Sequence, residues 1–160
     1  MMFLTKRQKL VISLIVTFAA ALIGSIFTAP SVNTWYSTLQ KPFFTPPNWA
    51  FGPVWTTLYF LMGLSFYFVW IKKSKKGIVK KAIKIYSTQL TLNVLWSVIF
   101  FGFRNILGGV LVISALWVSI LITIHRFYKL DKKAAYLLIP YILWVSLASF
   151  LNYFLWVLNI

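Results

Sequence analysis

The residues that acid–base or metal chemistry requires are nearly absent from this sequence. Its 160 residues contain one acid, Asp131, one histidine, His125, and no cysteine. A carboxylate pair for general acid–base catalysis, a protein-only metal site and a thiol nucleophile are therefore excluded. We interpret His125, which stands beside Arg126 at the end of an apolar stretch, as a solvated residue. The sequence thus predicts no metal site and argues against an enzyme with such machinery.

One apolar stretch near the middle of the chain carries polar and aromatic side chains on a single helical face. At about 100° per residue, that face collects Tyr86, Gln89, Asn93, Trp96, Ser97 and Phe100. An amide without a partner in an apolar medium costs on the order of several kcal/mol, so we expect Gln89 and Asn93 to point into the protein. Two interpretations stay open: the amides bond between helices, or they are the polar anchors of a ligand pocket.

Two other stretches place aromatic residues at helical spacing. Pro53 suits the first turn of a helix, and the residues that follow it at this spacing are Trp55, Tyr59, Met62 and Phe66. Near the end of the chain, the small Ala148 lies one turn after Trp144 and leaves open volume beside that ring. We expect Pro140, just before them, to bend its helix or free a carbonyl group.

Composition identifies the elements that must position these residues. The chain is 61% apolar and only 11% charged, whereas about a quarter of the residues of an ordinary globular protein are charged. Five stretches are long enough to cross a bilayer as helices, at about residues 10–29, 51–71, 85–103, 106–124 and 134–160. The first exceeds the apolar run of a signal peptide, so we interpret it as a retained helix. The fold class predicted for residues 1–160 is all-α, one domain formed by a bundle of five transmembrane helices.

The placement of charge predicts the topology of the bundle. The 16 Lys and Arg residues against one acid give a net charge of +15, but they lie at the ends of the apolar stretches, so nucleic acid is not the expected partner. The N-terminal tail has three of these basic residues, and the four connections that follow have one, seven, one and four, the seven lying between Lys72 and Lys84. High and low numbers therefore alternate along the chain. The positive-inside rule then puts the N-terminus in the cytoplasm and the first loop and C-terminus outside, in a bacterial cell membrane. The seven lysines from Lys72 to Lys84 are expected to attract anionic membrane lipid rather than to form a specific site.

Depth separates two groups of tryptophans. Trp96 and Trp144 lie too far inside their stretches for the aromatic belt at the membrane surface. We interpret the remaining tryptophans of the helices as interface anchors or lipid-facing bulk: Trp70, Trp117 and Trp156.

The first connection, residues 30–50, is rich in both proline and aromatic residues. The segment from Trp35 to Trp55 has three tryptophans and four prolines. Proline restricts the backbone to extended and turn conformations, which lowers the entropy cost of holding aromatic rings in place. We expect this loop to be a semi-rigid lid that holds Trp35, Tyr36 and Trp49 over the end of the bundle.

Three segments in order resemble the translocator protein family (TspO/MBR), whose members are also called peripheral benzodiazepine receptors or tryptophan-rich sensory proteins. They are WYSTLQKPFFTPPNWAFGPVWTTLYFLMG, YSTQLTLNVLWSVIFFG and PYILWVSLASFLNYFLWVLN. The resemblance runs in register from about residue 10 to the end. It implies a five-helix bundle, commonly a homodimer, with a pocket near the first loop for porphyrins and for isoquinoline- or benzodiazepine-type ligands, and in animal members sterols.

The resemblance also implies which residues line that pocket. They come from the loop and from the second, third and fifth helices: Trp35, Tyr36, Trp49, Trp55, Tyr59, Asn93, Ser97, Trp144 and Ala148. The sterol pattern of the family is incomplete here, because Tyr153 is followed by FLWVLNI without a basic residue. A tetrapyrrole such as protoporphyrin IX remains the expected ligand, and no further cofactor is required.

Porphyrin propionates would need hydrogen-bond donors near the mouth of the pocket. By composition we expect these to be Gln40, Lys41, Asn48 and the indole N–H of Trp49. The expected function is a receptor or sensor that binds tetrapyrroles and facilitates their movement. The alternative is light- and oxygen-dependent degradation of the porphyrin, with Trp55 and Trp144 as redox partners. A scaffold that only assembles with other membrane proteins would leave the pocket without a purpose.

Overall fold

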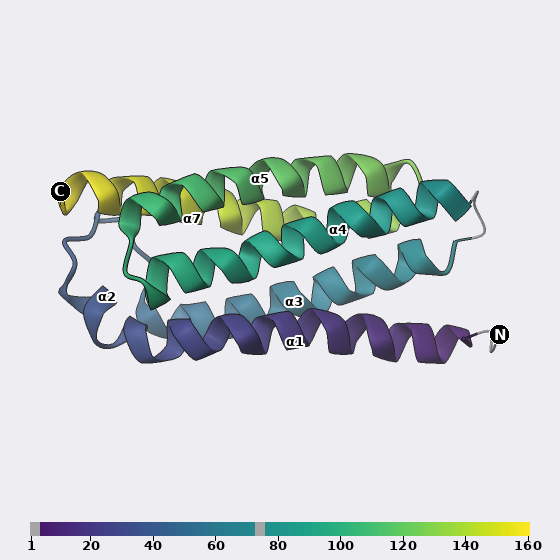
Figure 1. Ribbon diagram of the computed structural model, residues 1–160, viewed down its shortest axis with the longest axis horizontal. Helices are drawn as coiled ribbons and strands as arrows, with labels where there is room; N and C mark the ends of the chain where they lie inside the picture. The colour runs from purple at the N-terminus through teal and green to yellow at the C-terminus, as the bar shows by residue number, and fades with distance from the viewer. Residues whose placement is uncertain (1–3, 73–75) are drawn as a thin grey trace.

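The computed structural model describes residues 4–72 and 76–160, and these residues form a bundle of helices without a strand. Five long helices run side by side, and the two ends of the chain lie at opposite ends of the bundle (Figure 1). All five are long and apolar enough to cross a membrane. The predicted five-helix transmembrane bundle is confirmed.

The first half of the chain forms two spans and a short helix between them. The first span, α1 (Lys6–Val32), begins at a capping box in which the hydroxyl of Thr5 accepts from the backbone N–H of Gln8. The short helix α2 (Trp35–Thr38) lies in the first connection. The second span, α3 (Asn48–Trp70), contains Pro53 in its first two turns, where the missing N–H breaks few helical bonds.

The third span begins earlier than its apolar content suggests. Helix α4 (Lys76–Ser97) continues as one turn of π-helix, η1 (Val98–Gly102). The sequence predicted its start at residue 85, yet the helix already includes the exposed Lys80, Lys81 and Lys84. Lysine has a good helix propensity, so a helix need not end where the apolar stretch does.

The last two spans are joined at a break near proline. Helix α5 (Ile106–Tyr128) is followed by the short α6 (Lys132–Tyr136) and by α7 (Ile139–Leu158). The fifth stretch is thus one short and one long helix, because Pro140 occupies the first turn of α7 and has no N–H to continue a helix through Leu137 and Leu138. Around the bundle, the order of neighbours is α1, α3, α6 with α7, α5 and α4.

Two glycines allow α1 to approach its neighbours closely. A Cβ on Gly63 would lie 2.8 Å from Cδ2 of Leu14, and one on Gly24 would lie 3.2 Å from Oγ of Ser97. The small residues Ala20 and Gly24 of α1 are both buried inside the chain, so they serve internal packing.

Candidate ligand cavity

A cavity of about 760 Å³ lies among α1, α3 and α4, at the end of the bundle that carries the first connection. This volume falls within the range of about 300–1,000 Å³ that small-molecule sites occupy. Its wall on α1 is mostly small and its wall on α3 is mostly aromatic, while α4 contributes Asn93, Trp96 and Ser97. The residues that line the cavity include Phe18, Ala21, Gly24, Thr28, Asn33, Asn48, Trp49, Phe51, Trp55, Tyr59, Asn93, Trp96 and Ser97.

Trp55 stands at the centre of the aromatic wall. The centre of its ring lies 5.7 Å from that of Tyr59, 6.5 Å from that of Trp96 and 6.3 Å from that of Tyr141. Trp96 is fixed in turn, since its indole Nε1 donates to Oδ1 of Asn152 on α7 at 2.8 Å. Ring pairs at these separations are attractive, so the wall is held in place before any ligand arrives.

Asn93 forms the polar centre of the site. The hydroxyl of Tyr59 donates to its Oδ1, and its Nδ2 donates to the hydroxyl of Tyr141 at 2.9 Å. This tyrosine–asparagine–tyrosine network joins α3, α4 and α7, and Asn93 is only 1% exposed. The bonding interpretation of this amide is therefore confirmed. Asn93 also lines the cavity, and its use as the polar anchor of a ligand stays a prediction.

Gln89 lies one turn below Asn93 on the same face of α4. It is buried as the sequence predicted, yet neither atom of its amide has a hydrogen-bond partner within the described part of the chain. Unpaired amides of this kind are rare in protein interiors. The polar face of α4 thus extends beyond the cavity, toward the buried hydrogen bond between Tyr86 and Thr17.

The mouth of the cavity is formed where α1 ends and α3 begins. Nδ2 of Asn48 donates to Oδ1 of Asn33 at 3.5 Å, which links the two sides. Trp49 lines the rim, with 77% of its surface exposed. An exposed indole at this position is free to move against an entering ligand.

Five of the nine predicted site residues lie together on the cavity wall: Trp49, Trp55, Tyr59, Asn93 and Ser97. The other four lie outside this wall. Trp144 packs against Phe51 with ring centres 6.0 Å apart, on the α7 side, and Ala148 is half-buried one turn further along α7. Phe51 itself lines the cavity, so it separates Trp144 from that space.

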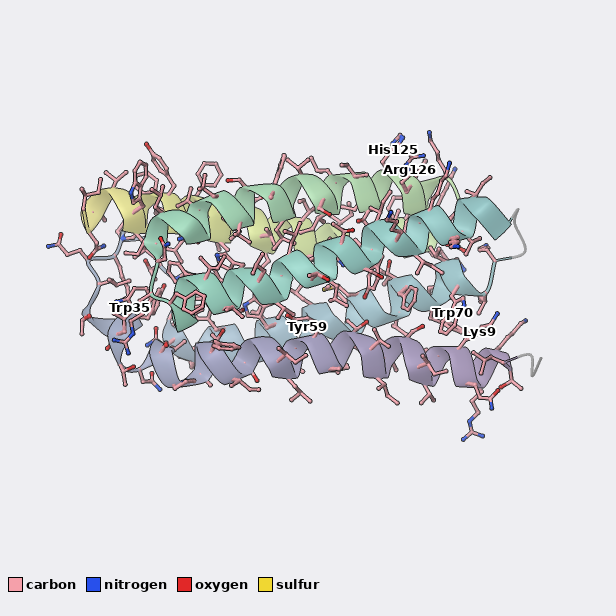
Figure 2. All side chains as sticks on the ribbon, in the orientation of Figure 1. Lys9, Trp35, Tyr59, Trp70, His125 and Arg126 are labelled. Atoms are coloured by element: carbon pink, nitrogen blue, oxygen red, sulfur yellow. The ribbon has the colours of Figure 1, made fainter. Side chains whose placement is uncertain are left out.

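Trp35 and Tyr36 lie in α2, at the loop end of the bundle (Figure 2). The ring centres of Trp35 and Phe100 lie 5.5 Å apart, and those of Tyr36 and Phe51 lie 6.1 Å apart. Burial raises the pKa of Tyr36 to about 12, and among the described residues its hydroxyl has no hydrogen-bond partner. Both residues thus contact the aromatic wall from outside the cavity.

The first connection is fastened to the far side of the bundle. The side chain of Asn159, just after α7, accepts from the backbone N–H of Gln40 at 2.9 Å and donates to the backbone carbonyl of Gln40 at 3.0 Å. The ammonium group of Lys41 donates to the carbonyl of Ser37 and lies 4.9 Å from the centre of the Tyr36 ring. Of the four expected propionate donors, Asn48 and Trp49 line the cavity, whereas Gln40 and Lys41 do not.

One of the tryptophans expected at the membrane surface, Trp70, lies at the other end of the molecule (Figure 2). Trp70, His125 and Arg126 all lie far from Trp35, as does Lys9, whose ammonium group is 5.8 Å from the centre of the Trp70 ring (Figure 2). His125 is exposed, in agreement with its interpretation as a solvated residue. Trp117 differs from a simple anchor, because its Nε1 donates to Oγ of Ser146 at 2.8 Å.

The contribution of α1 to the cavity is absent from the sequence-based site. Ala21, Ser25 and Ala29, which recur on α1 at a spacing of four residues, all line the cavity. Small residues both permit close packing and leave space, and the spacing alone does not distinguish these outcomes. The signal was therefore present, but it was ambiguous.

Fold and cavity together define a multi-pass membrane protein with an aromatic cavity inside a five-helix bundle. The model of the TspO/MBR family matches residues 12–157. The chain is 47% identical to the tryptophan-rich protein TspO of Archaeoglobus fulgidus, over 94% of this chain and 97% of that protein. It is 40% identical to the human translocator protein, over 84% of this chain and 80% of that protein, and 36% identical to protein CrtK of Rhodobacter capsulatus, over 88% and 86%. The chain belongs to the TspO/MBR family.

Proposed function

We propose that this protein is a membrane receptor that binds a tetrapyrrole of the protoporphyrin IX type in the cavity among α1, α3 and α4, and that it senses the ligand or facilitates its movement. One observation carries the proposal: a cavity of about 760 Å³ whose wall is built from aromatic rings packed around Trp55. A flat conjugated ligand stacks on such rings, and apolar walls exclude water from it.

The polar groups of the cavity suit the edge of the same ligand. Asn48 and the indole N–H of Trp49 lie at the mouth, where propionates would be solvated. Isoquinoline- and benzodiazepine-type molecules, which are smaller and aromatic, are proposed to use the same space. The missing basic residue after Tyr153 makes a sterol a poor candidate.

Quenching of tryptophan fluorescence tests the proposal. We expect protoporphyrin IX to quench the purified protein in detergent saturably. Ala21→Leu adds bulk to the cavity wall and should weaken binding about tenfold. Extra carbon atoms in a space that the ligand fills cost on the order of 1–3 kcal/mol of binding free energy. The matched control is Ala115→Leu, at an exposed position of α5. Unsaturable quenching, or equal affinities in the two variants, would contradict binding in this cavity.

The same assay examines the part of the predicted site that lies behind Phe51. If the ligand moves Phe51 aside and reaches Trp144, then Ala148→Leu weakens binding as Ala21→Leu does. If it stays within the cavity, Ala148→Leu binds as the control does. The comparison therefore decides how many of the nine predicted residues contact the ligand.

A second candidate function is light-driven oxidation of the bound tetrapyrrole by dioxygen. The observation that favours it is that Trp55, one of the two expected redox partners, lines the cavity with its ring centre 6.5 Å from that of a second lining indole, Trp96. The other expected partner, Trp144, lies behind Phe51. Illumination of the complex in air, followed through the main porphyrin absorption band, separates the candidates. If the porphyrin is converted to a new pigment, and Trp55→Phe abolishes this conversion, the result supports light-driven oxidation. Bleaching at the rate of free porphyrin supports binding alone.

We also propose the orientation and assembly of the molecule. The N-terminus lies in the cytoplasm and the first connection outside, in a bacterial cell membrane, because the basic residues are concentrated at the end opposite the cavity. A homodimer is proposed to use α1, which has the smallest buried share of the five spans. Cross-linking in membranes and labelling of engineered cysteines at the two ends test these proposals.

A further inference from the structure

A second recess, also of about 760 Å³, lies at the end of the bundle opposite the ligand cavity. It is bounded by the start of α1, the end of α3 and the connection between α5 and α6. We call it the lysine recess, and its lining residues are Lys6, Phe68, Ile71, Lys72, Tyr128, Lys129, Leu130, Asp131, Lys132 and Lys133. Figure 2 shows this end of the molecule, where Lys9, His125 and Arg126 are labelled.

The lysine recess carries a charge that the protein does not neutralise. Five lysines and one aspartate give its lining a net charge of +4. Asp131 is the only acidic side chain of the whole chain, so no second carboxylate exists to pair with the remaining lysines. Like charges held together at a membrane surface repel one another, and a bound anion relieves that repulsion.

Asp131 is already occupied by contacts that build the recess. Its carboxylate is 2.6 Å from Nζ of Lys72 at the end of α3, and it accepts from the backbone N–H of Ala134 at 3.1 Å. Burial opposes ionisation, but the hydrogen bonds from Lys72 and Ala134 outweigh it and lower the pKa of this carboxyl group. Asp131 therefore stabilises the structure of the recess and forms an ion pair with only one of its five ammonium groups.

The remaining cations lie around an apolar floor. The ammonium group of Lys132 is 5.5 Å from the centre of the Tyr128 ring, and Lys6, Lys129 and Lys133 are exposed. Phe68, Ile71 and Leu130 are half-buried beside them. A soluble anion would use the basic rim alone, whereas a molecule with a phosphate at one end and hydrocarbon at the other would use both surfaces.

We propose that the lysine recess binds an anionic phospholipid, with its phosphate held by Lys6, Lys129 and Lys133 and its acyl chains leaving over Phe68 and Ile71. The position agrees with this assignment, because the recess lies where the spans α3 and α5 end and where headgroups meet protein. The inference does not rest on tetrapyrrole binding, since the two cavities share no lining residue.

Native mass spectrometry of the detergent-purified, delipidated protein tests the proposal. Phosphatidylglycerol and phosphatidylcholine with identical acyl chains are titrated separately. We expect phosphatidylglycerol to bind with a stoichiometry of one at low concentration, at least about tenfold more tightly than phosphatidylcholine, because near-surface lysines each favour an anionic lipid. Equal binding of the two lipids would overturn the proposal.

Matched variants locate the binding within the molecule. The double change Lys129→Ser and Lys133→Ser should weaken phosphatidylglycerol about tenfold or more, whereas Lys80→Ser with Lys84→Ser, which removes the same charge from the exposed face of α4, should leave affinity within about twofold. Equal losses would mean that net charge, not the recess, attracts the lipid. If the first double variant does not fold, Lys6→Ser provides the same comparison against Lys80→Ser.

Competition identifies the source of the phosphate. Glycerophosphoglycerol, the deacylated form of phosphatidylglycerol, carries the polar part of the lipid without its chains. We expect it to displace phosphatidylglycerol only at concentrations at least about a hundredfold higher, because it lacks the acyl methylenes whose burial strengthens binding. Displacement at equal concentration would assign the recess to a soluble phosphate instead of a lipid and refute the proposal.

Discussion

Removing Asn93 tests how the hydrogen-bond network holds the cavity together. Asn93→Leu conserves most of the side-chain volume but deletes the bonds to Tyr59 and Tyr141. Each such bond in a membrane protein contributes on average about 0.6 and at most about 1.7 kcal/mol, so the two together give an expected loss of roughly 1–3 kcal/mol in the free energy of unfolding. Much of this loss comes from the two buried hydroxyls that are left without a partner.

The origin of the loss leads to a sharper expectation for multiple variants. Adding Tyr59→Phe and Tyr141→Phe to Asn93→Leu removes both stranded hydroxyls, and apolar replacement of all partners can be nearly neutral. We therefore expect the triple variant to be more stable than Asn93→Leu alone, by about 1 kcal/mol or more. The measurement is reversible unfolding in mixed micelles with increasing dodecyl sulfate.

The control for this series is Thr57→Val, on the same helix as Tyr59. Its hydroxyl donates to the carbonyl of Pro53 within α3 and is exposed, so its removal should change the free energy of unfolding by less than about 0.5 kcal/mol. If the losses of the three single variants simply add in the triple variant, the network reasoning is refuted. Additivity would mean that the three side chains act as independent packing groups.

Two further substitutions test how the helices approach one another and how they are joined. Gly109→Ala should lower the free energy of unfolding by about 1–3 kcal/mol, because its Cβ would lie 2.7 Å from Cδ2 of Phe100, 3.1 Å from Cβ of Phe100 and 3.2 Å from Oδ1 of Asn152; Gly77→Ala, where a Cβ meets nothing within 4 Å, should not, and equal melting temperatures would contradict the packing argument. Because the pKa of Asp131 is lowered, its carboxylate stabilises the folded protein above the ordinary carboxyl pKa of 3.8. This stabilisation is lost as the pH falls through the lowered pKa. Asp131→Asn should therefore cost about 1 kcal/mol at pH 7 and flatten the acid end of the stability profile, and an unchanged profile would show that the carboxylate contributes nothing.

Apolar patterning was sufficient to predict the bundle and the inward direction of several side chains, whereas the pocket itself was implied by the family resemblance. Gln89 and Asn93 could be placed inside because an amide in hydrocarbon needs a partner, and both are buried. Trp55 and Tyr59 were found from helical spacing after Pro53, and they line the cavity. In these cases the cost of exposing a polar side chain to hydrocarbon, or the spacing along one helix, is enough to predict the direction in which the side chain points.

The remaining details depend on relations between helices that no single stretch contains. Helical phase turns Trp144 inward, but it cannot show that Phe51 of another helix stands between Trp144 and the cavity. The π-helical turn at Val98–Gly102 likewise follows from packing, since it allows the adjacent Phe100 and Phe101 both to be buried. The early start of α4 was missed because apolarity locates a membrane span and not the full length of its helix.

The pair of hydrogen bonds between Gln40 and Asn159 has a consequence for the biogenesis of the protein. The two residues are separated by 119 positions, and four of the five spans lie between them. A nascent chain that has inserted its first four spans already possesses every lining residue of the cavity, yet Gln40 in its first connection still lacks its hydrogen-bond partner. Only insertion of the final span supplies Asn159, so a ribosome must finish the last helix before the entrance is secured.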